Sequence, residues 1–381
     1  MRKQFFLLLR SALFDKPIDE DEKRKITADS MPLLYKIAKR HDLTHLIGEA
    51  LDKNGLLPEE TDIKKIFLHE RDMAIYRYQQ LRYEYIRICD TLEKAKIRFL
   101  PLKGSVLRDY YPSPWMRTSC DIDILVKPED LQTAFSALKD GLSYRDEGIS
   151  AKDAHLFSKS GVHLELRYSN KASNPKWQTI LDSIWQNVQN PDDYKLKLTN
   201  EAFYFYHMEH MAGHFLYGGC GVRFFLDVWV LNNKLTFNEE EKKRFLKEAD
   251  IESFASAVEA TSEFWFGEGE YSELVSSIEE YIINAGMYGD MTNRVAIQKT
   301  KRGGKLGYLK SRIFLPYDKL KHIYPILQKH PILYPLCQVR RWFRLFRKDT
   351  KGRITKEFNE ATHGDSEKSE RIVRMFEQLN I

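Results

Sequence analysis

Two aspartates, Asp121 and Asp123, stand two residues apart in a short run that alternates polar and apolar side chains. Successive side chains of a β-strand point to opposite faces, so residues two apart share a face. Ile122 and Ile124 would then point the other way, into a core. Two carboxylates fixed side by side form a hard, oxygen-rich site that suits Mg²⁺ bound together with substrate phosphates. The spacing therefore predicts a metal site on one face of a strand over residues 121–126.

A Gly-Ser pair, Gly104 and Ser105, follows the apolar run 97–102 and opens a helix-like turn over 106–111. Backbone N–H groups at the start of a helix bind phosphate oxygens, and glycine lets a phosphate approach closely. We therefore expect this backbone and the serine hydroxyl to hold substrate phosphates. Nearby cations that would stabilise developing negative charge are Lys103, Arg108 and Arg117. Arg117 is preferred because it lies in the loop just before the aspartates.

A third carboxylate is expected on a neighbouring strand if two metal ions take part in the chemistry. The run VHLELRY alternates, which places His163, Glu165 and Arg167 on one face of a strand. Glu165 is the preferred third carboxylate. Asp146 and Glu147 are the alternatives, although their segment has a weaker strand pattern.

The elements that must position these residues fall into four regions along the chain. We expect an N-terminal helical region over 1–94, a catalytic domain over 95–198, a helical domain over 199–290 and a basic helical extension over 291–381. Strands alternate with helices only in the second region. The fold class predicted from this order is α+β, with a small mixed β-sheet flanked by N-terminal helices and a C-terminal helical domain.

The longest predicted helix spans about residues 60–94, and its apolar stripe includes Ile66, Tyr76, Leu81 and Ile88. Five further helices are predicted over 201–216, 222–233, 238–249, 251–265 and 273–285. The glycines within 286–304 predict a loop there.

Three histidines, His207, His210 and His214, share one face of the first of these five helices, because they are spaced i, i+3 and i+7. They could line a site, hold a metal ion or pack in the interior, and no HExxH pattern accompanies them. Arg223 and Asp227 stand four residues apart on the next helix. This pair either contributes to the site or forms a structural salt bridge.

The charge of the chain is divided unevenly. Its 60 basic and 55 acidic residues give a net charge of +5, but residues 294–356 alone carry +16 and the remainder −11. Within the basic segment, one apolar stripe consists of Ile332, Leu336, Val339, Phe343 and Phe346, and the cations Arg340, Arg341, Arg344, Arg347 and Lys348 lie largely elsewhere. We expect either an anionic partner (RNA or a membrane surface), or a docking helix with a solvated basic face, or attraction of an anionic substrate.

The sequence indicates a cytoplasmic protein. Its four cysteines are far apart and form no CxxC pair, which is typical of a reducing compartment and argues against a cysteine zinc site. The apolar run Phe5–Leu9 is too short for a signal peptide and is followed by Arg10, so it predicts an amphipathic helix. No stretch approaches 18 apolar residues, so we expect no transmembrane segment.

The order of these motifs resembles the polymerase-β-like nucleotidyltransferase superfamily. The stretch LKGSVLRDYYP…R…DIDILV is similar to the uncharacterised bacterial nucleotidyltransferase family known as NTP-transferase type 5. HMAGHFLYGGCGVRFFLDVWVL, over 210–231, resembles the helical segment of that family, and the sequence over 314–346 resembles its C-terminal extension. Together these segments cover most of residues 95–346.

The resemblance implies a nucleotidyltransferase that moves an NMP group from an NTP, with ATP favoured, to a hydroxyl acceptor and releases pyrophosphate. It implies a two-metal Mg²⁺ site on Asp121, Asp123 and Glu165, with Glu165 also able to take the acceptor proton. The alternatives are a non-catalytic nucleotide- or RNA-binding module on the same fold, and a toxin-like nucleotidyltransferase that modifies tRNA.

The resemblance also places the second half of the site on helices. It implies that His210 and His214 line the cleft opposite the metal site, and that Arg223 and Asp227 do the same. One departure is visible, because the fifteen residues between the serine of the Gly-Ser pair and the first aspartate exceed the usual gap in the superfamily.

Overall fold

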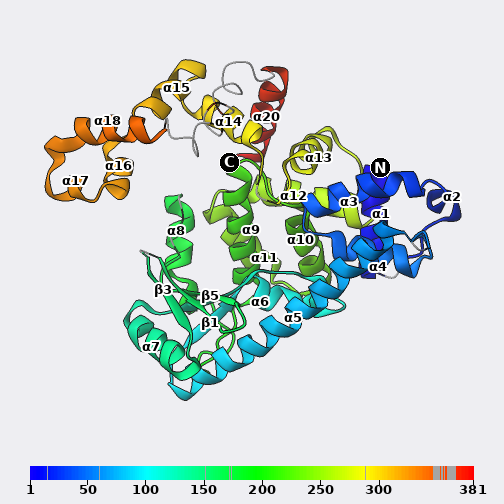
Figure 1. Cartoon of the computed structure of the whole chain (residues 1–381), viewed down its shortest axis with the longest axis horizontal. Coiled ribbons are helices and arrows are strands. Elements are labelled where there is room, and N and C mark those ends of the chain that lie inside the picture. Colours follow the sequence, from blue (N-terminus) through cyan, green and yellow to red (C-terminus); the bar gives the residue numbers. More distant parts are fainter. Residues whose placement is uncertain are drawn as a thin grey trace.

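The computed structural model describes residues 1–14, 16–59, 61–150, 152–170, 172, 174–287, 289–345, 352, 355, 357 and 366–381 (Figure 1). A small sheet lies at one end of the molecule, and helices from both ends of the chain gather beside it (Figure 1). The predicted α+β fold is therefore confirmed. Among the helices of the described residues, none combines the length and the apolar character that a membrane span requires.

The N-terminal part consists of α1 (Arg2–Phe14), α2 (Glu20–Lys23), α3 (Met31–Arg40), α4 (Thr44–Lys53) and α5 (Asp62–Lys94). In α1 the side chains of Phe5, Leu8 and Leu9 are fully buried, and the helix packs against α4 and against α12, which lies far away in the sequence. The long helix α5 is capped by the hydroxyl of Thr61 and runs from this helical group to the sheet (Figure 1).

The sheet contains β1 (Phe99–Leu102), β2 (Asp121–Val126), β3 (Arg145–Ile149), β4 (Asp153–Phe157) and β5 (His163–Arg167), in the order β1-β2-β5-β4-β3. Only β2 and β5 pair in parallel, so the sheet is mixed. Their register sets Asp123 opposite Glu165. The predicted strand over 121–126 is confirmed, and the predicted strand that carries Glu165 is β5, which pairs antiparallel with β4.

The two faces of the sheet have different neighbours. Ile122 and Ile124 pack on α5 and on α7 (Leu131–Leu142) in one apolar cluster. Leu125, on the opposite face with the aspartates, belongs to the main core that the surrounding helices share. Two short helices complete this region, α6 (Gly104–Leu107) after β1 and α8 (Pro175–Asp182) after β5.

The C-terminal half is helical. It comprises α9 (Asn200–Leu216), α10 (Val222–Lys234), α11 (Glu239–Glu248), α12 (Glu252–Phe266), α13 (Glu273–Ala285), α14 (Met291–Lys301), α15 (Lys305–Ile313), α16 (Tyr317–Ile323), α17 (Ile326–Lys329), α18 (Tyr334–Leu345) and α20 (Ser366–Leu379). Helices α9 to α13 join α1, α3 and α4 in the main core. Helices α15 to α18 reach away from the body of the molecule (Figure 1).

Two predictions about these helices are wrong. The expected loop over 286–304 contains α14, which buries Val295, Ala296 and Ile297. The apolar stripe of α5 also differs from the prediction, because Ile66 and Tyr76 are exposed. The buried stripe of this helix instead includes Phe67 and Ala74 together with Leu81 and Ile88, a seven-residue repeat.

Candidate active site

Three carboxylates meet on the face of the sheet that looks toward the helical domain. Asp121, Asp123 and Glu165 each place an oxygen within 4.8 Å of the others. Asp123 is buried and Asp121 and Glu165 are partly exposed. This closeness follows from the parallel pairing of β2 and β5, which aligns the two strands in register. An all-oxygen donor set of this kind fits Mg²⁺.

Two cations neutralise this cluster. The Lys103 Nζ lies 2.6 Å from Oδ1 of Asp123, and the same oxygen lies 3.0 Å from Nε of Arg167. Arg167 also donates to Oε2 of Glu165 at 3.0 Å. The sequence pattern put Arg167 on this face without giving it a role. Its position two residues beyond the glutamate on one strand was the signal that could have identified it.

The backbone at Lys103 is strained where β1 turns into α6. Its φ of 48° and ψ of −125° lie in a region that residues other than glycine rarely occupy. Burial disfavours the charge on Lys103, but the carboxylate of Asp123 outweighs this effect, so the pKa of the lysine is raised. The strained turn therefore places the charged ammonium group of Lys103 beside the carboxylates.

The surroundings of Asp121 increase its affinity for a proton. Burial raises its pKa, the neighbouring Asp123 raises it further, and Lys103 acts in the opposite direction. A divalent cation would relieve the same repulsion between the carboxylates.

A cavity of about 220 Å³ opens in front of the carboxylates. Its lining from the sheet side includes Lys103, Gly104, Asp121 and Asp123, and its lining from the helical side includes His210, His214 and Arg223. The site is thus enclosed between β2 and the helices α9 and α10.

The two residues of the Gly-Ser pair have different surroundings. A Cβ on Gly104 would lie 2.9 Å from the Cβ of Ser119, so glycine is needed for the close packing of the following loop. The hydroxyl of Ser105 is buried and has no hydrogen-bond partner within the described part of the chain. It borders a separate cavity lined also by Tyr110 and Lys197, whereas Gly104 borders the cavity of the carboxylates.

Arg108 holds the loop to the Gly-Ser turn. Its Nε donates to the carbonyl of Gly104 at 2.7 Å, and its Nη2 donates to Oγ of Ser119 at 2.6 Å. Burial, together with the charge of Arg117, lowers its pKa to about 10. Arg108 therefore positions the chain just ahead of the aspartates.

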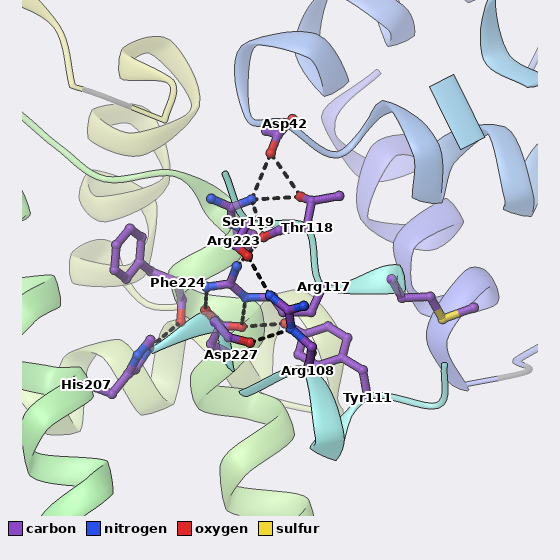
Figure 2. Close-up of polar contacts among 12 residues, drawn as sticks. Asp42, Arg108, Tyr111, Arg117, Thr118, Ser119, His207, Arg223, Phe224 and Asp227 are labelled. Atoms are coloured by element: carbon purple, nitrogen blue, oxygen red, sulfur yellow. Dashed lines mark hydrogen bonds and ion pairs between the residues drawn. The ribbon is translucent and has the colours of Figure 1, made fainter. Parts of the chain in front are cut away.

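Arg117, the preferred phosphate ligand from the sequence, borders the cavity but is already held by an acidic partner (Figure 2). Its Nε and Nη2 donate to the two oxygens of Asp227 at 2.6 and 2.9 Å, and Tyr111 donates to Oδ1 at 2.6 Å. Asp227 is completely buried. Burial alone would raise its pKa, but Arg117 outweighs this effect and the pKa is lowered.

Arg223 does not pair with Asp227, as the spacing on α10 had suggested for a structural salt bridge. Its Nη1 instead donates to Asp42 at 2.8 Å and to the hydroxyl of Thr118 at 2.8 Å (Figure 2). Asp42 lies between α3 and α4, so this contact ties the N-terminal helices and α10 to the loop before β2. Both arginine–aspartate pairs therefore fix this loop.

All three histidines of α9 border the cavity. His207 is buried against the carbonyl of Phe224 at 3.4 Å. The Nε2 atoms of His210 and His214 lie 3.2 Å apart, and both residues border the cavity. Burial lowers the pKa of all three imidazoles, so they are neutral at physiological pH.

Glu209, the neighbour of these histidines on α9, was not identified from the sequence. Burial raises its pKa to about 7, against the opposing charges of Arg167, Lys152 and Lys103. The runner-up acids lie elsewhere: Asp146 and Glu147 sit on the edge strand β3 and contact Lys139 and Arg145.

A comparison with known protein families identifies one match, a family described as uncharacterised nucleotidyltransferase, over residues 28–267. The match covers more than half of the chain and contains every carboxylate and cation described above. The chain belongs to this nucleotidyltransferase family. The segment 314–346 lies beyond the match, so its resemblance to a family extension stays a prediction. Neither the curated proteins nor the solved structures gave a match.

Proposed function

We propose that the protein transfers an NMP group from an NTP, with ATP favoured, to a hydroxyl acceptor in a Mg²⁺-dependent reaction that releases pyrophosphate. The observation that carries this proposal is the meeting of Asp121, Asp123 and Glu165 on one face of the sheet, where both aspartates border the cavity. Membership of a nucleotidyltransferase family supports the reaction class.

The donor set fits the metal that this reaction requires. Asp121, Asp123 and Glu165 would hold Mg²⁺, which when bound offsets phosphate charge and makes the acceptor hydroxyl more acidic. The proposal includes a two-metal site at these carboxylates.

The cations of the site have a role in binding the triphosphate. Lys103 and Arg167 each contact Asp123, and a triphosphate in the cavity offers them a second anionic partner. Gly104, the first residue of α6, borders the cavity next to Lys103, and we include its backbone in the proposed phosphate site. Glu165 is positioned on the same face to accept the proton of the acceptor.

The test is transfer of label from each of the four NTPs in the presence of Mg²⁺, with a cell extract as the source of acceptor. We expect wild type to transfer label and Asp123→Asn to lose transfer. Asp146→Asn is the matched control, because Asp146 is an aspartate of the same sheet that lies at its far edge. Equal labelling by wild type and Asp123→Asn would refute the mechanism. NTP binding without transfer by wild type would favour a non-catalytic module, and label on tRNA would favour the toxin-like reading.

We also propose an anionic lipid surface as the partner of the basic segment. The predicted stripe does not dock on the body: Ile332, Leu336 and Phe343 are 88, 66 and 73% exposed. Arg340 and Arg341 lie on α18, the helix that also carries Leu336 and Phe343. An exposed apolar row beside arginines suits the interface of an anionic membrane better than the backbone of RNA. Phe346, Arg347 and Lys348 lie outside the described residues.

Vesicle sedimentation tests this surface. The protein should bind vesicles of phosphatidylcholine with phosphatidylserine and should not bind vesicles of phosphatidylcholine alone. Phe343→Ser should weaken binding, whereas Tyr76→Ser, at an exposed aromatic of α5, should not. Binding to RNA that survives Phe343→Ser, with no binding to either vesicle, would contradict the proposal.

The location of the protein is a proposal of the same kind. The four cysteines, all within the described residues, are free thiols. Free thiols support a reducing compartment, and we propose the cytoplasm.

A further inference from the structure

A second group of metal-ligating side chains lies beside the carboxylates, on the same face of the sheet. His155 on β4 and His163 and Glu165 on β5 each place one ligand atom within 4.8 Å of the others. The antiparallel register sets His155 opposite Glu165, and His163 precedes Glu165 by two residues, so all three point to one face. We propose that these three residues form a binding site for a transition metal of the Zn²⁺ class.

The spacing of the two imidazoles suits this site. Nδ1 of His155 lies 3.0 Å from Nε2 of His163. Two nitrogens bound to one Zn²⁺ at about 2.0–2.1 Å are separated by about 2.9 Å at a right angle and about 3.4 Å at a tetrahedral angle. The two nitrogens are at the distance of a hydrogen bond, and a metal ion bound between them would take the place of its proton.

A neighbouring carboxylate prepares His155 to act as a ligand. Its Nε2 lies 3.2 Å from Oδ1 of Asp153. When this nitrogen carries the proton and donates to Asp153, the lone pair is left on Nδ1, which is the atom that faces His163. Histidine ligands of zinc are commonly held in this way by a carboxylate on the second ring nitrogen.

The other histidine is fixed by packing. The ring of His163 stacks on Phe157, with centroids 4.5 Å apart and an angle of 13° between the planes. The two histidines are partly exposed, so an ion can reach them from solvent. Each of the two histidines is therefore oriented by a further contact, His155 by Asp153 and His163 by Phe157.

The ligand types distinguish this site from the Mg²⁺ site. Two imidazole nitrogens and one carboxylate favour Zn²⁺, Co²⁺ or Ni²⁺, whereas the three carboxylates favour Mg²⁺. Three protein ligands leave a coordination position for water or for an acceptor group. Glu165 belongs to both ligand sets. If the proposed Mg²⁺-dependent reaction holds, Zn²⁺ would therefore compete with Mg²⁺ for this carboxylate.

Metal titration of the full chain tests the site. The protein is freed of metal with a chelator and titrated with Zn²⁺ against a chromophoric competitor, and with Co²⁺ followed by its visible absorption. We expect one tight site in wild type and at least about 100-fold weaker binding in His155→Gln and His163→Gln. Asp153→Asn should weaken binding by about 10- to 100-fold. His69→Gln, at an exposed histidine of α5, is the matched control and should bind as wild type does.

The outcomes separate this site from the proposed function. Asp123→Asn should keep the Zn²⁺ site while it loses Mg²⁺-dependent transfer, so either proposal can fail without the other. Wild type that binds no stoichiometric Zn²⁺ would overturn the inference, as would Gln variants that bind as tightly as wild type. Circular dichroism of each variant shows whether it is folded, and His163→Ala gives a second test at the same position.

Discussion

The buried ion pair between Arg117 and Asp227 offers the sharpest test of how the loop before β2 is held. Asp227 is completely buried and accepts hydrogen bonds from Arg117 Nε and Nη2 and from the Tyr111 hydroxyl. Asp227→Asn keeps the shape of the side chain but leaves the guanidinium without its counter-charge. Removing one partner of a buried pair costs about 3–5 kcal/mol, because the remaining charge stays desolvated.

The neighbouring substitutions give a rank order. Tyr111→Phe removes one hydrogen bond while Arg117 still satisfies the carboxylate, so we expect a loss of about 1–2 kcal/mol. Arg117→Met should cost about as much as Asp227→Asn, since it leaves the buried carboxylate without its counter-charge and with only the hydrogen bond from Tyr111. The triple variant Tyr111→Phe/Arg117→Met/Asp227→Leu should cost much less than the two charge deletions added together, because no charge is then left buried.

Denaturation by urea, followed by circular dichroism, measures these differences in the free energy of unfolding. The free energy of unfolding should also depend on pH, and the direction of this dependence follows from Asp227. Because the pKa of Asp227 is lowered in the folded protein, its contribution is complete above about pH 5 and is lost as the pH falls through the folded pKa. Asp227→Asn should therefore destabilise the protein at pH 7 and do so less at low pH. A loss below about 1 kcal/mol at pH 7, or a triple variant as unstable as the sum, would refute this reasoning.

Three further predictions concern the site. The carboxyl of Glu209 has a pKa of about 7 instead of 4.5, so the free energy of unfolding should fall by about 3 kcal/mol as the pH rises through this range. Glu209→Gln should remove this fall, and urea unfolding at pH 5 and pH 8 measures it. Lys103→Met should raise the affinity for Mg²⁺ and lower the affinity for NTP, because the ammonium group now occupies Asp123; isothermal titration calorimetry checks both. Gly104→Ala should cost about 1–3 kcal/mol of unfolding free energy through the contact with Ser119, and Ser119→Gly in the same chain should restore part of it.

Residue periodicity predicted most of the elements because those elements bury one face. The alternation over β2 and the spacing of α9 to α13 are strong, and these elements occur where they were expected. Helix α14 was missed because Gly303 and Gly304 end it and only a short apolar run supports it. The stripe of α5 was misjudged around Ile66 because the helix contacts different partners along its length.

The partners of the charged side chains were harder to predict. The carboxylates share a face by the two-residue period of a strand, so the sequence could bring Asp121 and Asp123 together. The engagement of Arg117 by Asp227 joins residues that are 110 positions apart, and no local pattern encodes such a pair. The same holds for Arg223, whose partner Asp42 lies 181 residues away.

The shared core also constrains the order in which the protein can fold. Helix α1 packs against α12, so α1 is synthesised more than 200 residues before this partner is made. Until then Phe6, whose ring stacks on Trp265 of α12 in the folded protein, lacks this cover, a state that favours binding by a chaperone. Contacts between such distant segments also slow folding. A fragment limited to the family match at residues 28–267 would lack α1 and would expose the surface of α12 that α1 covers.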